Sequence, residues 1–358
     1  MKVLGLITDA FGGRGGIAAV ARDMAWALDA CDKVEAVRFL PRFANADLGG
    51  LPVKAQQFKA RAGILDFTIA AIWRALLWQP TIIYCNHLNL TPVAAAAAWL
   101  TRSTLVAHLH GIEIWKAPTA MQRCALEAAD LLLCVSRDTR AKLLTFCDIA
   151  PERAVVLNNT FGSEYFPGDK KTARAKFGLS SESALLTVGR MATRERYKGH
   201  DQLLEALPDL LVDHPNLVYL VAGDGDDRLR LEAKARELGV DSHVRFLGHV
   251  DHADLPDLYR AADLYSMPST GEGFGVAFVE AMACGTPALG LAVGGAVDAF
   301  ADGELGIVAD KDRLSVSLQH GIDAPCCDRA LLASAVDGRF GRSVFAGRIN
   351  DVLERLAV

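Results

Sequence analysis

Short apolar runs alternate with helical stretches along almost the whole chain, and this alternation constrains the fold more than any other feature. In the first half the runs are Val3–Thr8, Val34–Phe39, Thr81–Cys85, Leu105–Leu109, Leu131–Val135 and Ala154–Leu157. Continuous apolar strands separated by helices are typical of a parallel sheet that helices cover on both faces. The sequence therefore predicts an α/β fold.

The same alternation repeats in the second half of the chain. Its predicted strands are Ala184–Val188, Val218–Ala222, Val244–Phe246, Leu264–Met267, Pro287–Leu291 and Ile307–Val308. Its predicted helices are His200–Asp213, Asp226–Leu238, Leu255–Ala261 and Val276–Ala283. The loop Asn158–Asp169 separates the halves and predicts domains at residues 1–163 and 164–358, with the last helix (about 340–358) a candidate to pack back on the first domain. Two doubly wound domains bind ligands beyond the carboxyl ends of their strands, so we expect a shared cleft.

Composition agrees with two packed cores. Hydrophobic residues make up 51% of the 358 residues and charged residues 23%, which excludes wholesale disorder. Lys and Arg number 38 against 43 Asp and Glu, and this balance gives no general attraction to nucleic acid. We expect no nucleic-acid partner.

The cysteines and the N-terminus predict a soluble, cytoplasmic protein. None of the 8 cysteines forms a Cys-x-x-Cys pair, and Cys134 sits in an apolar run, so we expect reduced cysteines that act as small hydrophobic residues and bind no metal. The first apolar run ends at Asp9, so the N-terminal segment does not resemble a signal peptide. The uncharged stretch Thr81–Leu100 contains Asn86 and Pro92 and does not resemble a membrane span.

A glycine-rich loop follows the first run and opens the predicted helix Ile17–Leu28. Its residues are Gly12, Gly13, Arg14, Gly15 and Gly16. Glycines allow a backbone to approach a ligand closely, and a helix N-terminus offers free N–H groups to an anion. The spacing matches neither a dinucleotide fingerprint nor a Walker loop, so the loop is either a ligand-facing phosphate or acceptor loop or a tight turn.

Two further loops follow directly after predicted strands. Arg190 and Lys198 flank a basic loop that suits a departing diphosphate, although such a loop is also a common solvated turn. Gly223 and Asp224 form a glycine–acid turn after the next strand, a pattern that is weak by itself.

The segment from Met267 to Glu280 is the strongest functional signal. A strand ends near Met267, a loop with Glu272, Gly273, Phe274 and Gly275 follows, and a helix begins near Val276. Backbone N–H groups of such a loop can meet a phosphate. Glu280 lies more than a turn into the helix, where a carboxylate can accept both ribose hydroxyls, whereas Glu272 would point toward a sugar. The alternative is a capped surface helix with two solvated glutamates.

His108 and His110 alternate with apolar residues and share one face of a strand. No third ligand is nearby, which argues against a zinc pair. His108 is expected to be a core histidine, whereas His110, at the strand end, can face the cleft.

These segments together resemble the retaining glycosyltransferases of family 4, which have the GT-B fold of two Rossmann-like domains facing a central cleft. The resemblance covers nearly the whole chain and is densest from Gly189 to Ala309. Its most specific element is a Glu-x7-Glu pattern, matched by Glu272 and Glu280. The run from Phe246 to Pro268 and the segment from Ala283 to Gly295 are similarly typical.

The resemblance implies a role for each candidate residue. Arg190 and Lys198 would hold the donor diphosphate, Glu280 the ribose, and Glu272 the donor sugar. The donor side would also include Gly223, Asp224 and the backbone of Gly273, Phe274, Gly275 and Val276. His110 matches the family's acceptor-side histidine, and Glu272, His110, Arg190 and Lys198 form the implied catalytic group. The diphosphate would leave from the front face without a protein nucleophile, a bound metal or a tightly held cofactor.

The implied function is transfer of a hexose from GDP-mannose or UDP-glucose to a glycan or polyprenyl-linked acceptor in surface or exopolysaccharide synthesis. The alternatives are a GT-B sugar-nucleotide epimerase or phosphorylase, and a non-catalytic nucleotide-sugar-binding protein. The sequence departs from the family at Asp298, where a glutamate is common, and in the motif from His110 to Trp115.

The segment Phe58–Gln79 combines Lys59, Arg61 and Arg74 with many apolar and aromatic residues. A basic helix of this kind can rest on the inner face of a membrane, where a lipid-linked acceptor is presented. Apolar residues on most of its circumference favour a buried helix instead.

Overall fold

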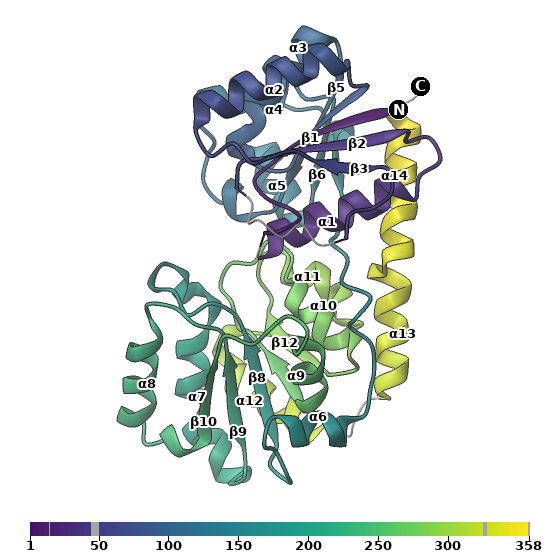
Figure 1. Cartoon of the computed structure of the whole chain (residues 1–358). Helices are drawn as coiled ribbons and strands as arrows, with labels where there is room; N and C mark the ends of the chain where they lie inside the picture. Colours follow the sequence, from purple (N-terminus) through teal and green to yellow (C-terminus); the bar gives the residue numbers. More distant parts are fainter. Residues whose placement is uncertain (14, 44–49, 325–327, 357–358) are drawn as a thin grey trace. The chain divides into compact units, whose positions relative to one another are not determined.

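The computed structural model describes residues 1–13, 15–43, 50–324 and 328–356, and it divides into two compact units (Figure 1). The first unit holds residues 1–160 together with helix α14 (Arg342–Leu356), and the second holds Phe161–Phe340. Each unit contains one all-parallel sheet, which confirms the predicted α/β class.

The seven strands of the first unit are ordered β3-β2-β1-β4-β5-β6-β7. They are β1 (Lys2–Ile7), β2 (Ala36–Pro41), β3 (Ala55–Gln57), β4 (Ile82–Cys85), β5 (Thr104–Leu109), β6 (Leu131–Cys134) and β7 (Ala154–Val156). The other helices of this unit are α1 (Gly16–Asp29), α2 (Ile64–Trp78), α3 (Thr91–Thr101), α4 (Ala120–Glu127) and α5 (Arg137–Phe146).

Side chains alternate across this sheet and build one apolar layer on each face. Leu4 and Leu6 belong to the layer shared with α2 and α3, whereas Val3 and Ile7 belong to the layer shared with α1 and α14. Figure 1 shows the two helix pairs on opposite sides of the strands. Because both faces are covered, the strands are apolar at most of the positions that reach a core.

Helix α14 is remote in sequence from the unit that it completes. It packs along α1 and buries Phe345, Ile349, Val352 and Leu353 in the layer that also holds Met24 and Leu28 of α1. The first unit is therefore built from both ends of the described chain.

The six strands of the second unit are ordered β10-β9-β8-β11-β12-β13. They are β8 (Ala184–Val188), β9 (Val218–Ala222), β10 (Val244–Gly248), β11 (Leu264–Ser266), β12 (Ala288–Leu291) and β13 (Ile307–Ala309). The helices are α6 (Lys170–Lys176), α7 (His200–Asp213), α8 (Arg228–Glu237), α9 (Leu255–Ala261), α10 (Val276–Ala283), α11 (Ala296–Ala299), α12 (Leu314–Asp323) and α13 (Arg329–Phe340).

An aromatic row runs beneath α9 and α10 in the second unit. The ring of Tyr265 lies edge-on to Tyr259 and to Phe278, with centroids 5.6 Å apart in both pairs, and Phe278 meets Phe300 at 4.7 Å. Aromatic pairs in edge-to-face geometry contribute about 0.5–1.5 kcal/mol beyond the burial of their area. The row therefore fixes the position of α10 on the sheet.

The predicted elements are confirmed along most of the chain. The bounds of β8, β9, α7, α9 and α10 match the prediction residue for residue. The three-residue strand β3 was not predicted. The preference for a buried helix at Phe58–Gln79 was wrong, because α2 buries only Phe67, Ala71 and Ala75 among its side chains and leaves Leu65, Trp73 and Leu77 exposed.

The cysteines and the helix lengths bear on two further predictions. The cysteines that the structure describes are all free, and each is buried except Cys124, as expected for packing residues. Cys326 and Cys327 lie outside the described residues. Among those residues, no helix has both the length and the apolar character that a bilayer crossing requires.

Candidate functional site

Four loops of the second unit meet at the carboxyl edge of its sheet. The strand order reverses between β8 and β11, and ligands bind at such switch points in open α/β sheets. The loop after β8 carries Arg190 and Lys198, and the loop after β11 carries Glu272. The two are joined where the Thr270 amide donates to the Tyr197 carbonyl at 2.8 Å. The predicted basic loop and the predicted acidic loop therefore flank one point of the sheet.

Close backbone approach between these loops depends on glycine at two positions. A Cβ added to Gly223 (φ +131°) would lie 2.0 Å from the Gly189 carbonyl oxygen, and one added to Gly295 would lie 1.9 Å from that of Gly273. The Gly295 amide also donates to the Glu272 carbonyl at 2.8 Å. Because a larger residue would clash at either position, glycine allows the loops after β9 and β12 to pack against the loops after β8 and β11.

Glu195 holds the two predicted phosphate-binding cations together. One of its carboxylate oxygens accepts from the Arg190 guanidinium at 2.6 Å, and the other lies 3.2 Å from Lys198 Nζ. The Glu195 side chain is only 7% exposed, whereas that of Arg190 is 66% exposed. A buried carboxylate between two cations fixes their side chains and leaves N–H groups of Arg190 for a ligand.

Glu272 lies in the electrostatic field of the same cluster. Burial raises the pKa of its carboxyl above the ordinary value, and Glu195 raises that pKa further. Lys198 and the Gly273 amide act in the opposite direction and lower it. A desolvated carboxylate next to a cation suits a partner with hydroxyl groups or partial positive charge, such as a sugar ring.

Glu280 accepts a hydrogen bond from a tyrosine. The Tyr259 hydroxyl donates to one Glu280 carboxylate oxygen at 2.9 Å, and burial together with Glu280 raises the pKa of Tyr259 well above its ordinary range. Burial raises the pKa of the Tyr165 phenol above its ordinary range, and Glu280 raises it further. Both phenols stay protonated at neutral pH and can orient the carboxylate.

The remaining donor-side predictions divide between backbone and side chain. The Phe274 ring is buried and packs edge-on against Phe340, with centroids 5.5 Å apart, so only the backbone of Phe274 can serve a ligand. Gly275 (φ +89°) precedes Val276, the first residue of α10. The Asp224 carbonyl accepts from the Met191 amide at 3.1 Å, which places the Gly223–Asp224 turn beside the basic loop.

In the first unit, His108 lies inside β5 and His110 follows directly after the strand. His108 is fully buried, and its Nδ1 lies 2.8 Å from the Tyr84 hydroxyl, which confirms a core histidine. His110 is half-buried just past β5, with Nε2 2.8 Å from the Asn86 carbonyl oxygen and its ring 4.6 Å from His108. Burial lowers the pKa of both imidazoles, so both are neutral at neutral pH. No group of His, Cys, Asp or Glu within the described ranges could hold a metal ion.

The glycine loop of the first unit opens α1. Gly13 fits against the Asp9 side chain, since an added Cβ would lie 2.0 Å from its carboxyl carbon, and Arg22 donates to the Gly13 carbonyl at 3.1 Å. Gly15 (φ +95°) precedes α1 and supplies no side-chain cap, and both Gly15 and Gly16 have open space where a Cβ would be. Gly12 has φ +84°. Arg14 lies outside the described residues.

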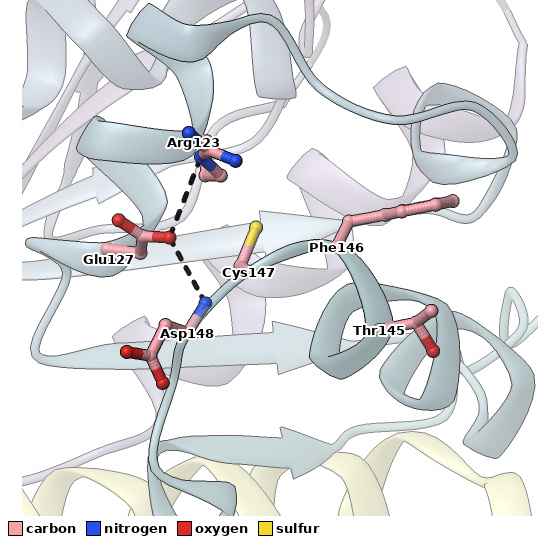
Figure 2. A pocket seen from close by; sticks show the side chains of 6 residues that line it. All are labelled: Arg123, Glu127, Thr145, Phe146, Cys147 and Asp148. Carbon is pink, nitrogen blue, oxygen red and sulfur yellow. Dashed lines mark hydrogen bonds and ion pairs between the residues drawn. The ribbon is translucent and has the colours of Figure 1, made fainter.

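The first unit also contains a hollow whose lining residues give little indication of a catalytic site. It encloses about 510 Å³ and is lined by Arg123, Glu127, Thr145, Phe146, Cys147 and Asp148 (Figure 2). The Glu127 carboxylate faces Arg123 at 3.9 Å and accepts from the Asp148 amide at 3.1 Å. Burial raises the pKa of Cys147 to about 11, so this thiol is protonated and not activated as a nucleophile.

The sequence prediction missed Glu195, Tyr259 and Tyr165. Glu195 had a detectable signal, because a carboxylate three residues before Lys198 in a basic loop forms an i,i+3 pair. The tyrosines lie in a helix and a loop distant from Glu280 in sequence, and only the fold brings them to it.

Comparisons with known proteins bear on the family and the fold of the chain. Residues 14–161 match the family model described as Glycosyltransferase Family 4, and residues 169–324 match Glycosyl transferases group 1. The chain is 35% identical over 246 residues to D-inositol 3-phosphate glycosyltransferase 2 of Catenulispora acidiphila, covering 64% of this chain and 57% of that protein. It is 32% identical over 289 residues to D-inositol 3-phosphate glycosyltransferase 1 of the same organism, covering 73% of this chain and 68% of the relative.

The relatives extend beyond the matched region, and in the enzyme of Kribbella flavida that region is 47% of the length. Among solved structures, the Anabaena protein HepE in complex with UDP-glucose superposes with a TM-score of 0.80 at 23% identity, over 99% of this chain and all of that one. Sucrose-phosphate synthase from Thermosynechococcus elongatus gives 0.82 at 22% identity, over 99% of both chains. The chain thus belongs to the family 4 glycosyltransferases and has their GT-B fold.

Proposed function

We propose that the protein transfers a hexose from a nucleoside-diphosphate sugar to an acceptor hydroxyl with retention of configuration. The arrangement of Arg190, Lys198 and Glu272 around Glu195 at the switch point of the second sheet carries this proposal. The family membership supports a transferase over the two alternatives, an epimerase or phosphorylase and a non-catalytic nucleotide-sugar-binding protein.

In this mechanism Arg190 and Lys198 bind the donor diphosphate and stabilise the charge that develops as it leaves. Such preorganised charges, together with positioning, supply most of the catalysis in transfer reactions of this kind. Because Glu195 already holds both cations, little reorganisation is needed when the diphosphate departs.

The two glutamates take separate parts of the donor. Glu280, oriented by Tyr259, accepts the ribose hydroxyls. Glu272 and the backbone from Gly273 to Val276 hold the transferred sugar. The acceptor hydroxyl attacks from the face that the diphosphate leaves, and the neutral His110 lies on the acceptor side. No protein nucleophile and no tightly bound metal takes part.

For the donor we propose UDP-glucose or GDP-mannose. The solved neighbour HepE was crystallised with UDP-glucose, which supports a nucleotide sugar and favours UDP as the first donor to test. Asp298, where the family often has glutamate, lies three residues past Gly295 in α11 and is buried, so it is the residue on which the choice of sugar would depend.

For the acceptor we propose a glycan or a polyprenyl-linked glycan in surface polysaccharide synthesis, reached by peripheral contact with the inner face of the membrane. The exposed apolar side of α2 supports that contact. The names of the relatives add D-inositol 3-phosphate as a soluble acceptor to include in the test.

A thermal-shift panel of UDP- and GDP-sugars, followed by transfer assays, tests the proposal. A specific donor should raise the melting temperature, because it binds the folded state preferentially. That donor should then lose its sugar to D-inositol 3-phosphate or to a lipid-linked acceptor, with the anomeric configuration retained. Interconversion of the donor without acceptor would establish an epimerase, a requirement for inorganic phosphate a phosphorylase, and donor binding without any turnover a binding protein.

A further inference from the structure

Helix α2 carries two apolar stripes, and only one of them reaches the core. Phe67, Ala71 and Ala75 recur every four residues and are fully buried. On the opposite side Leu65, Ile69, Trp73 and Leu77 recur at the same spacing and are 76%, 69%, 62% and 67% exposed. We call this second stripe the α2 face. A contiguous exposed apolar surface of this kind marks an interaction site.

The neighbouring helix extends the exposed apolar surface. Helices α2 and α3 pack side by side on one face of the sheet and run parallel, because each leads back from the end of one parallel strand to the start of the next (Figure 1). Both helices therefore end near the N-terminal ends of the strands. Trp99, near the end of α3, is 80% exposed. Aromatic side chains of this type are enriched at membrane–water interfaces.

A pocket opens between α2, the sheet and the segment that precedes the helix. It encloses about 460 Å³, and Ile69, Trp73 and Leu77 of the α2 face form part of its wall. The other lining residues are Leu4, Arg38, Phe58, Arg61, Asp66, Ala70, Arg74 and Trp78. Arg38 is unusual in this setting, because it occupies the interior of β2 in register with Leu4.

The pocket is positively charged. Three guanidinium groups line it against the single carboxylate of Asp66, which pairs with Arg61 at 3.2 Å. Neither Arg38 nor Arg74 forms an ion pair with any residue that the structure describes. Burial lowers the pKa of Arg74, and repulsion from the nearby Arg61 and Arg38 lowers it further. An anion would relieve that repulsion.

Aromatic rings hold two of these guanidinium groups in place. Arg38 stacks over Trp78 at 4.4 Å from the ring centroid, and Arg74 stacks over Phe58 at 3.5 Å. Stacking fixes the plane of a guanidinium and leaves N–H groups along its edge free to bind a phosphate. The pocket is thus a built site with donors, excess positive charge and an apolar rim.

We propose that this pocket binds the phosphate head group of an anionic phospholipid while the α2 face enters the acyl region of the same membrane. The combination of a positively charged pocket with an adjoining exposed apolar stripe determines which partner fits. A soluble phosphate compound would use the guanidinium groups and leave the adjoining apolar stripe in water. A second copy of the chain would bring a like-charged pocket near its own equivalent across a two-fold axis. An anionic bilayer satisfies both parts of the surface at once.

This inference rests on the membrane contact in the proposed function but not on sugar transfer. The test uses the full chain and vesicles of phosphatidylcholine alone or mixed equally with phosphatidylglycerol. We expect cosedimentation only with the mixed vesicles, weakened by salt, because a basic residue near an anionic surface attracts it electrostatically. Brominated acyl chains should quench tryptophan fluorescence, and Trp73→Phe should remove a large part of that quenching.

Two sets of variants separate the charged pocket from the apolar face. Arg38→Gln, Arg61→Gln and Arg74→Gln together should weaken binding to mixed vesicles by roughly tenfold or more. The control removes three charges from exposed positions of the second unit, Arg236, Lys311 and Arg339, and should leave binding nearly unchanged. Trp73→Ser with Leu77→Ser should also abolish binding, whereas Leu229→Ser with Leu331→Ser, equally exposed elsewhere, should not. Circular dichroism should show all variants folded.

Several results would overturn the proposal. These are equal binding to neutral vesicles, equal losses in the control variants, and binding of inorganic phosphate at the pocket without vesicle binding. A dimer in light scattering that Trp73→Ser dissociates would assign the α2 face to self-association instead. Donor binding is measured separately by thermal shift, so a failure here leaves the proposed transferase function standing, and the reverse also holds.

Discussion

Glu195 and Lys198 form an ion pair at 3.2 Å in which the carboxylate is almost completely buried and the ammonium group borders the candidate donor site. The second oxygen of the same carboxylate binds Arg190 at 2.6 Å. Neither cation can therefore move freely, and the proposed diphosphate site is organised by a residue that would not itself touch the diphosphate.

Glu195→Gln tests this positioning role. We expect donor KM to rise by roughly tenfold, because the amide can no longer hold two cations, with a smaller effect on kcat. Glu232→Gln is the matched control, since it removes the partner of Arg228 in a half-exposed pair of α8. An unchanged KM in Glu195→Gln, with the fold intact, would show that the cations need no such support.

Lys198→Ala should remove a charge that acts on the leaving diphosphate. We expect kcat to fall by about 10²–10³ and the affinity for UDP or GDP to weaken, since loss of one charge-stabilising group typically costs that much. Lys176→Ala, which breaks an exposed pair with Asp254 and Asp257, serves as the control. Full activity in Lys198→Ala would contradict the assignment of the basic loop.

Glu272 should show a conflict between stability and activity. Its pKa is raised in the folded state, so ionised Glu272 destabilises the fold at neutral pH, and this penalty disappears as the pH falls below the unfolded value of 4.5. Glu272→Gln should therefore unfold at a higher urea concentration at neutral pH while losing transfer activity. The gain in stability should shrink as the pH approaches 4.5. A variant that is less stable at neutral pH would refute this view of the carboxylate.

Tyr259→Phe removes only the hydroxyl that donates to Glu280 at 2.9 Å. A hydrogen bond to a charged group contributes about 1.5–3 kcal/mol, so donor affinity should fall by roughly tenfold or more. In a double-mutant cycle with Glu280→Gln the two losses should not add, because both act on one contact. Tyr219→Phe deletes a buried hydroxyl that bonds to Thr187 elsewhere in the unit and should leave donor affinity unchanged.

Gly295→Ala should disturb the site through the backbone. The new methyl would lie 1.9 Å from the Gly273 carbonyl oxygen, so the loop after β12 must move away from Glu272. We expect a loss of stability of about 1–3 kcal/mol and a larger loss of activity. Gly338→Ala in α13 meets nothing within 4 Å and should stabilise the protein by roughly 0.5–1 kcal/mol. A neutral effect of Gly295→Ala would mean that the loops are not in contact in solution.

Local patterns in the sequence predict most of this fold. The strands β8 and β9 are continuous apolar runs between turns, and their bounds follow directly from the residues. The strand β3 has only three residues, Ala55–Gln57, of which two are polar, so no periodicity could reveal it. Short edge strands form by pairing with a neighbour rather than by their own pattern.

Burial and remote contacts are harder to predict. The apolar circumference of α2 is visible in the sequence, but the same residues would suit a core or a membrane surface, and only the packed neighbours distinguish them. Arg38 reaches the pocket under α2 from β2, a strand that β3 and a loop separate from the helix in the sequence. Similarly, the loops of Glu272 and Lys198 are enough to propose both residues for the site, whereas the contact of Tyr259 with Glu280 depends on the packing of α9 beside α10.

The packing of α14 on α1 also has a consequence for the order in which the chain folds during synthesis. The ribosome completes all strands of the first unit early, but their apolar layer on the α1 side stays open until Phe345, Ile349, Val352 and Leu353 have emerged. The second unit, whose residues form one continuous segment from Phe161 to Phe340, has no such delay. The nascent first unit therefore exposes an apolar surface until α14 has emerged, and α14 would displace a chaperone bound to that surface.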